Sequence, residues 1–261
     1  MSAVPAVGHI LPLLDLAGAL RAAGHDVLFA THQDRHTLIE DAGLPAVAAG
    51  MSHTAMVQER LRRWPETISQ PATKWAGRMW TEIMAPSTLR DLRRIIGEWS
   101  PHVVMHDEGD YGAPVAAAEV GIPWITHAWG SPLRSMAELT GLEPLVTDLW
   151  ASRNLIAPPF GGLYRHGLVN PCPPFLQEQV AGAPVVWPLR PRPLQQQEPP
   201  VSADAYVGFG TVPTFADAPD ELTASIRACI ARGMRVVVTV PDPQLRQRLA
   251  TIDENLVDAR A

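Results

Sequence analysis

Short apolar runs and stretches of helical periodicity alternate along most of the chain. The apolar runs are rich in strand-forming residues and predict strands at residues 26–31, 44–47, 101–106 and 122–127. Apolar residues at helical spacing predict the intervening helices at residues 12–23, 34–42, 110–120 and 135–154. Because strand and helix follow one another repeatedly, the pattern favours an α/β fold with a doubly wound parallel sheet.

The same pattern restarts after a proline-rich stretch. Residues 188–201 are rich in proline and glutamine, and we expect them to form an interdomain linker of restricted flexibility. Beyond this stretch the predicted strands are residues 205–209 and 235–240, and the predicted helices are 221–232 and 244–250. We therefore expect an N-terminal domain over residues 1–187 and the incomplete start of a second α/β domain over residues 202–261.

Residues 51–99 differ from the rest because they are expected to be helical and carry many large apolar side chains. These side chains are Met51, Met56, Trp64, Trp75, Met79, Trp80 and Met84. Packing in a helical core explains any single one of them. Methionine and tryptophan also suit the wall of a pocket for a bulky apolar ligand, so both interpretations stay open.

Composition narrows the possible functions. The chain has 261 residues, with 21 basic and 27 acidic side chains and a net charge of -6. A nucleic-acid-binding protein would show a basic patch, so this class is not expected. Cys172 and Cys229 have no metal-binding or redox spacing, which favours free thiols in the cytoplasm. No apolar run approaches the roughly 20 residues of a membrane span, so no integral membrane segment is expected.

A Gly-His turn near the N-terminus is the first candidate for chemistry. His9 lies between the short apolar segment Ala3-Val4 and a helix that we expect to open with Pro12 in its first turn. Ligands of open α/β sheets bind at this edge. The partial positive charge of a helix N-terminus disfavours imidazolium, and a neutral imidazole can accept a proton as a general base. A loop or capping histidine without chemistry is the alternative.

An acidic residue stands at the equivalent edge further along the chain. Asp107 directly follows the predicted strand 101–106, and the carboxyl ends of parallel strands meet at one edge of the sheet. Asp107 can therefore face the same crevice as His9. A helix cap is the equally plausible role for this aspartate.

Six segments stand out along the chain in a fixed order and spacing. They are Val4–Leu13, Leu20–Val27, Pro101–Asp107, Gly121–Pro123, Pro171–Pro174 and Val207–Pro213. Taken together, these motifs resemble the bacterial GT-B glycosyltransferases that decorate macrolides, polyketides and other natural products. The likeness extends along nearly the whole chain, and the order and spacing of the motifs are more specific than any one of them.

The resemblance implies two Rossmann-like domains, of which the first binds the acceptor and the second the nucleotide sugar. It implies that His9 is the base of an inverting transfer and that Asp107 holds its other nitrogen, with Glu108 and Asp110 as fallback partners. Gly210 and Thr211 would lie near the donor phosphates. The co-substrate would be a UDP or dTDP sugar, with no metal and no further cofactor. We assign the bulky acceptor to Trp75, Met79, Trp80 and Trp129.

The chain also departs from the family pattern. Only the tail of the first strand precedes the Gly-His turn, and the His- and Gly-rich donor box is absent. We therefore expect a fragment of a longer product that does not turn over by itself and whose unpaired edges favour a homodimer. The alternatives are a non-catalytic relative that binds a small molecule or helps another transferase, and, less favoured by the Trp- and Met-rich segment, a sugar epimerase of the same fold.

Overall fold

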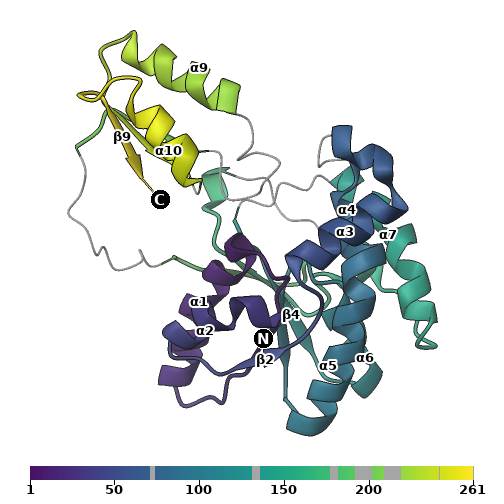
Figure 1. Cartoon of the computed structure of the whole chain (residues 1–261). Coiled ribbons are helices and arrows are strands. Elements are labelled where there is room, and N and C mark those ends of the chain that lie inside the picture. Colours follow the sequence, from purple (N-terminus) through teal and green to yellow (C-terminus); the bar gives the residue numbers. More distant parts are fainter. Residues whose placement is uncertain are drawn as a thin grey trace. The chain divides into compact units, whose positions relative to one another are not determined.

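A computed structural model describes residues 1–70, 74–130, 136–176, 182–191, 202–208, 219–240 and 242–260 (Figure 1). The chain divides into two compact units, Met1–Arg192 and Pro193–Ala261. The division falls inside residues 188–201, the stretch expected to be a linker. The linker itself lies mostly outside the described residues, so its role stays a prediction.

The first unit alternates strands and helices along its length. Its strands are β1 (Phe29–Thr31), β2 (Ala46–Ala48), β3 (Val104–Asp107), β4 (Trp124–His127), β5 (Leu168–Asn170) and β6 (Val186–Pro188). Its α-helices are α1 (Val7–Ala22), α2 (His36–Asp41), α3 (His53–Arg63), α4 (Ala76–Arg78), α5 (Ala85–Trp99), α6 (Gly112–Val120) and α7 (Met136–Ala151). Shorter turns are the 3-10 helices η1 (Gln33–Arg35), η2 (Pro65–Ser69), η5 (Pro159–Gly162) and η6 (Pro174–Leu176), and the π-helix η4 (Met79–Met84).

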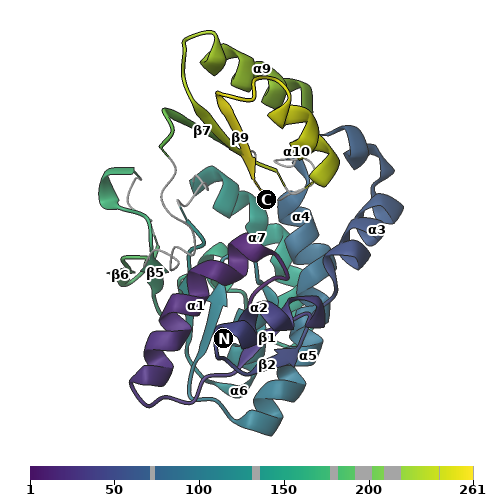
Figure 2. The same cartoon turned by 60° about the vertical axis from the view of Figure 1, so that its left-hand side comes forward.

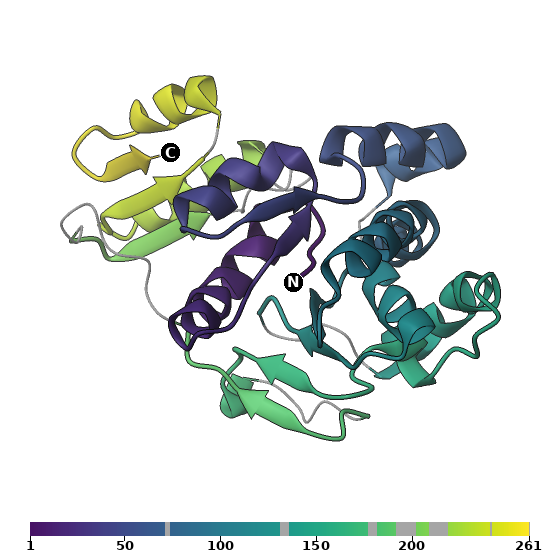
Figure 3. The ribbon, with the colours of Figure 1, turned by 90° about the horizontal axis from the view of Figure 1, so that it is seen from below.

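All strand pairs of this unit are parallel, which confirms the predicted fold class. β1 pairs with β2, and β3, β4, β5 and β6 pair in that order. Ser2 forms bridges to both Ala30 and His106, so the chain start lies between β1 and β3 and joins the two sets of strands. Helix α1 covers one face of the sheet, and α5 and α6 cover the other (Figures 2 and 3). This is the doubly wound arrangement.

Helix α1 begins earlier than the sequence predicts. The expected start at Pro12 is wrong, because the helix runs from Val7 and Pro12 lies inside it. Ala6 is the N-cap residue, and its carbonyl accepts hydrogen bonds from the backbone N–H groups of His9 and Ile10. Proline is tolerated because the carbonyl it leaves without a donor belongs to Gly8, which is exposed to water. His9 is therefore the third residue of the helix rather than part of a preceding turn.

Two apolar clusters fix the sheet between its helices. On the α1 face, Ile10, Leu13 and Ala17 pack against Phe29 and Ile39. On the other face a larger cluster surrounds Trp124 and Trp150, whose rings lie 6.1 Å apart between centroids. Both indole N–H groups donate to backbone carbonyls of the turn η5. These bonds fix η5 beside the amino end of β4, and the candidate site lies at the opposite, carboxyl ends of β3 and β4.

The second unit repeats the pattern on a smaller scale. Strands β7 (Ala205–Gly208), β8 (Val236–Thr239) and β9 (Val257–Arg260) are parallel and ordered β7-β8-β9. Helices α9 (Pro219–Ile230) and α10 (Pro243–Ala250) bury Leu222, Ile226 and Leu249 against this sheet. The predicted strands and helices of this region are thus confirmed, and β9 is an addition. Gly210 and Thr211 lie outside the described residues.

Candidate functional site

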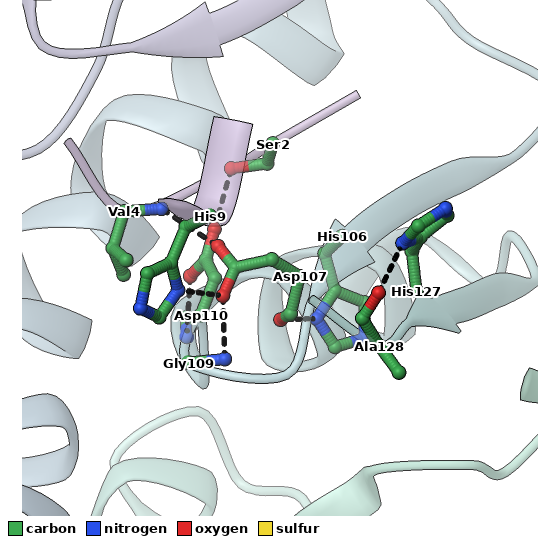
Figure 4. A network of polar contacts seen from close by, with 10 residues as sticks. Ser2, Val4, His9, His106, Asp107, Gly109, Asp110, His127 and Ala128 are labelled. Atoms are coloured by element: carbon green, nitrogen blue, oxygen red, sulfur yellow. Dashed lines mark hydrogen bonds and ion pairs between the residues drawn. The ribbon is translucent and has the colours of Figure 1, made fainter. Parts of the chain in front are cut away.

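His9 and Asp107 meet at the carboxyl edge of the first sheet. His9 is supplied by the first turn of α1, and Asp107 is the last residue of β3. His9 Nδ1 lies 2.9 Å from Asp107 Oδ1 (Figure 4). The carboxylate is fully buried, whereas 17% of the histidine side chain is exposed. The two residues are 98 positions apart in sequence, and the topology of the sheet brings them together.

Three donors hold the Asp107 carboxylate in one orientation. Oδ1 also accepts from the backbone N–H of Gly109 at 2.6 Å, and Oδ2 accepts from the backbone N–H of Val4 at 2.7 Å. An ionised carboxylate can only accept hydrogen bonds, so His9 Nδ1 is the donor in this pair. The arrangement therefore selects the tautomer in which Nε2 carries a lone pair, as the carboxylate does in hydrolytic triads.

Gly109 leaves the space that this pair requires. A Cβ atom at this position would lie 2.9 Å from Asp107 Oδ1 and 3.1 Å from His9 Cε1. Both distances are shorter than ordinary van der Waals contact, so any larger residue would push into the hydrogen bond. The loop after β3 thus needs glycine for close packing beside the imidazole.

The two fallback carboxylates have other partners. Asp110 Oδ1 accepts from the backbone N–H groups of Gly112 and Ala113 at the start of α6, and Oδ2 accepts from the Ser2 hydroxyl at 2.5 Å. Burial, and secondarily the negative charge of Asp107, raise the pKa of Asp110 to about 7. Glu108 accepts a hydrogen bond from the Tyr164 hydroxyl at 2.8 Å. Asp107 is therefore the member of the acidic trio that contacts His9.

Two buried histidines stabilise the strand ends beside Asp107. His106 Nδ1 donates to the Asp107 carbonyl at 2.8 Å, and its Nε2 lies 3.1 Å from the Thr126 hydroxyl. Burial lowers the pKa of His106 to about 4, so this ring is neutral near pH 7. His127 Nδ1 lies 2.6 Å from the Ala128 carbonyl, and burial lowers the pKa of His127 as well. Both rings are positioning groups for the loops that follow β3 and β4.

Trp80 and Trp129 flank the imidazole of His9. The Trp129 ring centroid lies 4.1 Å from that of His9, and the Trp80 centroid lies 6.2 Å away. Trp80 comes from the π-helix η4, and Trp129 follows β4. The predicted residues Trp75 and Met79 are instead buried, each with 8% of its surface exposed, in a cluster that packs against Trp80. The four predicted aromatic and methionine residues thus split into a pair beside His9 and a pair behind it.

Sequence reasoning missed several residues that build the site. Val4, Ser2 and Gly109 hold or make room for the carboxylates, and His106 and His127 fix the strand ends. The available signal was a polar histidine at the end of each otherwise apolar strand. The contacts of Ser2 and Val4 depend on how the chain start pairs with β1 and β3, which no local pattern specifies.

The described part of the chain offers no group of three or more His, Cys, Asp or Glu side chains that could hold a metal ion. Neither Cys172 nor Cys229 takes part in a disulfide. No helix within the described ranges is long and apolar enough to cross a membrane.

Comparison with known sequences shows which proteins this chain is similar to. Residues 18–147 match the model of the erythromycin biosynthesis protein CIII-like N-terminal domain. The chain is 30% identical over 158 residues to an L-demethylnoviosyl transferase of Streptomyces niveus, covering 58% of this chain and 41% of that protein. It is 34% identical over 163 residues to the elloramycin glycosyltransferase ElmGT of Streptomyces olivaceus, covering 58% and 40%. The chain thus spans about 40% of the length of these curated relatives.

Comparison with solved structures shows the fold. The spinosyn rhamnosyltransferase SpnG, complexed with thymidine diphosphate, superposes with a TM-score of 0.70 at 21% identity, covering 99% of this chain and 70% of that chain. The glycosyltransferase VinC, in complex with dTDP, gives a TM-score of 0.63 at 20% identity, covering 99% and 71%. The fold is therefore that of the GT-B glycosyltransferases, as the sequence resemblance implied.

Proposed function

We propose that this chain, a natural-product glycosyltransferase-like protein of the GT-B fold, carries the acceptor-activating part of an inverting glycosyltransferase. The transfer moves a sugar from a nucleoside diphosphate to a hydroxyl group of a bulky, partly apolar small molecule. His9 is the general base, and Asp107 is its positioning residue. The observation that carries this proposal is the 2.9 Å contact between a part-exposed imidazole and a fully buried, triply held carboxylate.

The proposed chemistry is a single displacement with balanced proton and electron flow. His9 Nε2 takes the proton of the acceptor hydroxyl while the hydroxyl oxygen attacks the anomeric carbon of the donor sugar. The bond from that carbon to the diphosphate breaks, and the nucleoside diphosphate leaves with the electron pair. Asp107 stabilises the imidazolium that forms and keeps Nε2 available for the next cycle. One displacement inverts the configuration at the anomeric carbon.

The substrates follow from the site and its relatives. Trp80 and Trp129 beside His9 suit a large apolar acceptor, and Trp75 and Met79 belong to the buried cluster that packs against Trp80. For the donor we propose a dTDP or UDP sugar, and the thymidine diphosphate named in the related complexes favours the first. Gly210 and Thr211 are proposed near the donor phosphates on the strength of the family resemblance. A homodimer remains a prediction.

A transfer assay on the protein that carries this chain tests the proposal. Replacing His9→Ala removes the base and is expected to lower turnover by about 10²–10⁴-fold, with nucleotide binding nearly unchanged. NMR of the product should show the anomer opposite to that of the donor. His102→Ala, which removes an exposed histidine before β3, is the matched control and should retain full activity. Turnover that survives in His9→Ala contradicts the assigned base, and a retained anomeric configuration contradicts the single displacement.

A further inference from the structure

We propose that the acceptor presents its reacting hydroxyl on a flat aromatic ring, which binds against the Trp80–Trp129 pair beside His9. This inference rests on the proposed function and narrows its acceptor from a bulky apolar molecule to a fused-ring phenol. What supports it is the arrangement of three aromatic rings, the imidazole of the base and two indoles, rather than the apolar character of the region alone.

The three rings form one cluster. Centroid distances are 4.1 Å from His9 to Trp129, 6.2 Å from His9 to Trp80, and 5.5 Å from Trp80 to Trp129. The planes are inclined by 49° to 64°, so the rings meet as tilted or edge-to-face pairs. The two separations that involve Trp80 lie within the range of about 4.5–7 Å that aromatic pairs prefer, and His9 and Trp129 lie slightly closer together than that. Another flat ring placed beside this cluster would meet indole faces and edges in the same favourable geometries.

Exposure distinguishes this cluster from the aromatic core of the same unit. Trp80, Trp129 and His9 are each partly exposed, whereas Trp124 and Trp150 retain only 6% and 2% of their surface. The indoles beside the base are therefore accessible to a ligand, and those in the core are not. Tryptophan with one accessible side is typical of binding surfaces because it supplies a large rigid contact area.

Trp80 is the second residue of the π-helix η4. Within Met79–Met84 the wider turn changes the phase of the side chains relative to an α-helix. Met79, Ile83 and Met84 stay buried, with 8%, 3% and 4% of their surfaces exposed, while Trp80 reaches the His9 ring. Wide turns of this kind occur frequently at functional sites.

Proton chemistry at His9 points to the same acceptor. Imidazole is a moderate base, so it removes a proton more easily from a hydroxyl group of lower pKa. A phenol, with a pKa of about 10 like the tyrosine hydroxyl, gives up its proton more readily than an aliphatic alcohol. A phenolic hydroxyl at Nε2 therefore fits both the base and the rings around it.

Binding of two alcohols that share a carbon skeleton tests the inference without requiring turnover. Equilibrium dialysis of the 261-residue chain against 2-naphthol and decahydro-2-naphthol compares a flat aromatic ring with its saturated form. We expect 2-naphthol to bind about ten-fold more tightly, which corresponds to about 1.4 kcal/mol. A merely apolar pocket would bind the saturated alcohol at least as well.

Three variants assign the preference to the cluster. Trp80→Leu and Trp129→Leu each remove one indole but keep apolar bulk, and each should reduce the ten-fold preference to within about two-fold. Trp99→Leu removes a tryptophan that is 40% exposed at the end of α5 and should leave the preference intact. Equal binding of the two alcohols, binding of neither, or a preference that survives both indole replacements overturns the inference. His9→Ala turnover tests the proposed function separately, because the transfer assay measures proton removal whereas dialysis measures binding alone.

Discussion

Gly109→Ala is the substitution that tests the geometry of the site most sharply. The new Cβ would lie 2.9 Å from Asp107 Oδ1, 3.1 Å from His9 Cε1 and 3.3 Å from His9 Nδ1. It would therefore enter the space beside the hydrogen bond that orients the base. Gly109 also donates its backbone N–H to the same carboxylate oxygen at 2.6 Å, which limits how far that oxygen can retreat.

The size of the effect follows from these distances. Reaching ordinary van der Waals contact requires the oxygen and the new methyl group to separate by about 0.5 Å. A shift of that size along the 2.9 Å bond between His9 and Asp107 takes it beyond the usual hydrogen-bond limit of about 3.2 Å. We expect turnover to fall by about 10²-fold with little change in acceptor affinity. Overpacking, partly offset by the lower entropy of the unfolded chain, should reduce the free energy of unfolding by about 1–2 kcal/mol.

Steady-state transfer kinetics and denaturant unfolding measure the two effects. Gly18→Ala is the matched control because Gly18 lies in the same helix as His9 and an added Cβ meets nothing within 4 Å. That control should keep full activity and gain up to about 1 kcal/mol in stability. If Gly109→Ala matches the control in both turnover and stability, the close packing of the loop against the His9–Asp107 pair is refuted.

Two further predictions concern the neighbouring carboxylates. Asp107→Asn should lower turnover by about 10²–10⁴-fold and change the acceptor KM by less than about three-fold, because it disturbs the orientation of the base; a loss confined to acceptor affinity would contradict this role. Asp110 has a folded-state pKa raised from 3.8 to about 7, so the native state holds the proton of Asp110 more tightly than the unfolded state does. The contribution of Asp110 to the free energy of unfolding therefore declines by at most about 4 kcal/mol as pH rises from about 4 to 7. Burial lowers the pKa of His106 to about 4, so His106 makes the free energy of unfolding fall as pH falls below about 6.5. Because this effect opposes that of Asp110, Asp110→Asn must be compared with the wild type at each pH. Urea unfolding should show the stability of Asp110→Asn relative to the wild type rising between pH 4 and 7, and a constant difference would contradict the shifted pKa.

Much of the fold could be predicted from the sequence because its signals are local. Apolar runs predict strands such as 122–127, and helical periodicity that ends at a glycine predicts helices such as 110–120. β5, β6 and β9 were not predicted. β5 and β9 each show only an apolar pair between polar or glycine residues, Leu168-Val169 and Leu256-Val257, whereas β1 and β2 lie in longer apolar runs. The start of α1 was misplaced because Pro12 usually marks a first turn, whereas here the exposed carbonyl of Gly8 tolerates it.

The site was predictable in part. His9 and Asp107 were singled out because both follow strands that end at one edge of a parallel sheet, a rule of topology rather than of local sequence. That same rule could not decide between Asp107 and Asp110, since their hydrogen-bond partners depend on how residues 1–3 pair with the sheet. Composition likewise could not separate Trp75 from Trp80, because which of the two indoles is buried depends on the tertiary packing of this segment.

The proposed base is His9, whose Nδ1 is held by Asp107 and whose Nε2 faces the acceptor with a lone pair. Nitrogen NMR measures directly which ring nitrogen of His9 carries the proton. The 261-residue chain is labelled with ¹⁵N-histidine, and spectra are recorded at a pH where the ring is neutral. The His9 signal, assigned by its loss in His9→Ala, should show a protonated Nδ1 and an unprotonated Nε2, and Asp107→Ala should shift the tautomer balance toward protonated Nε2. A His9 ring that is protonated at Nε2 in the wild type would contradict the central claim, because no lone pair would then face the acceptor.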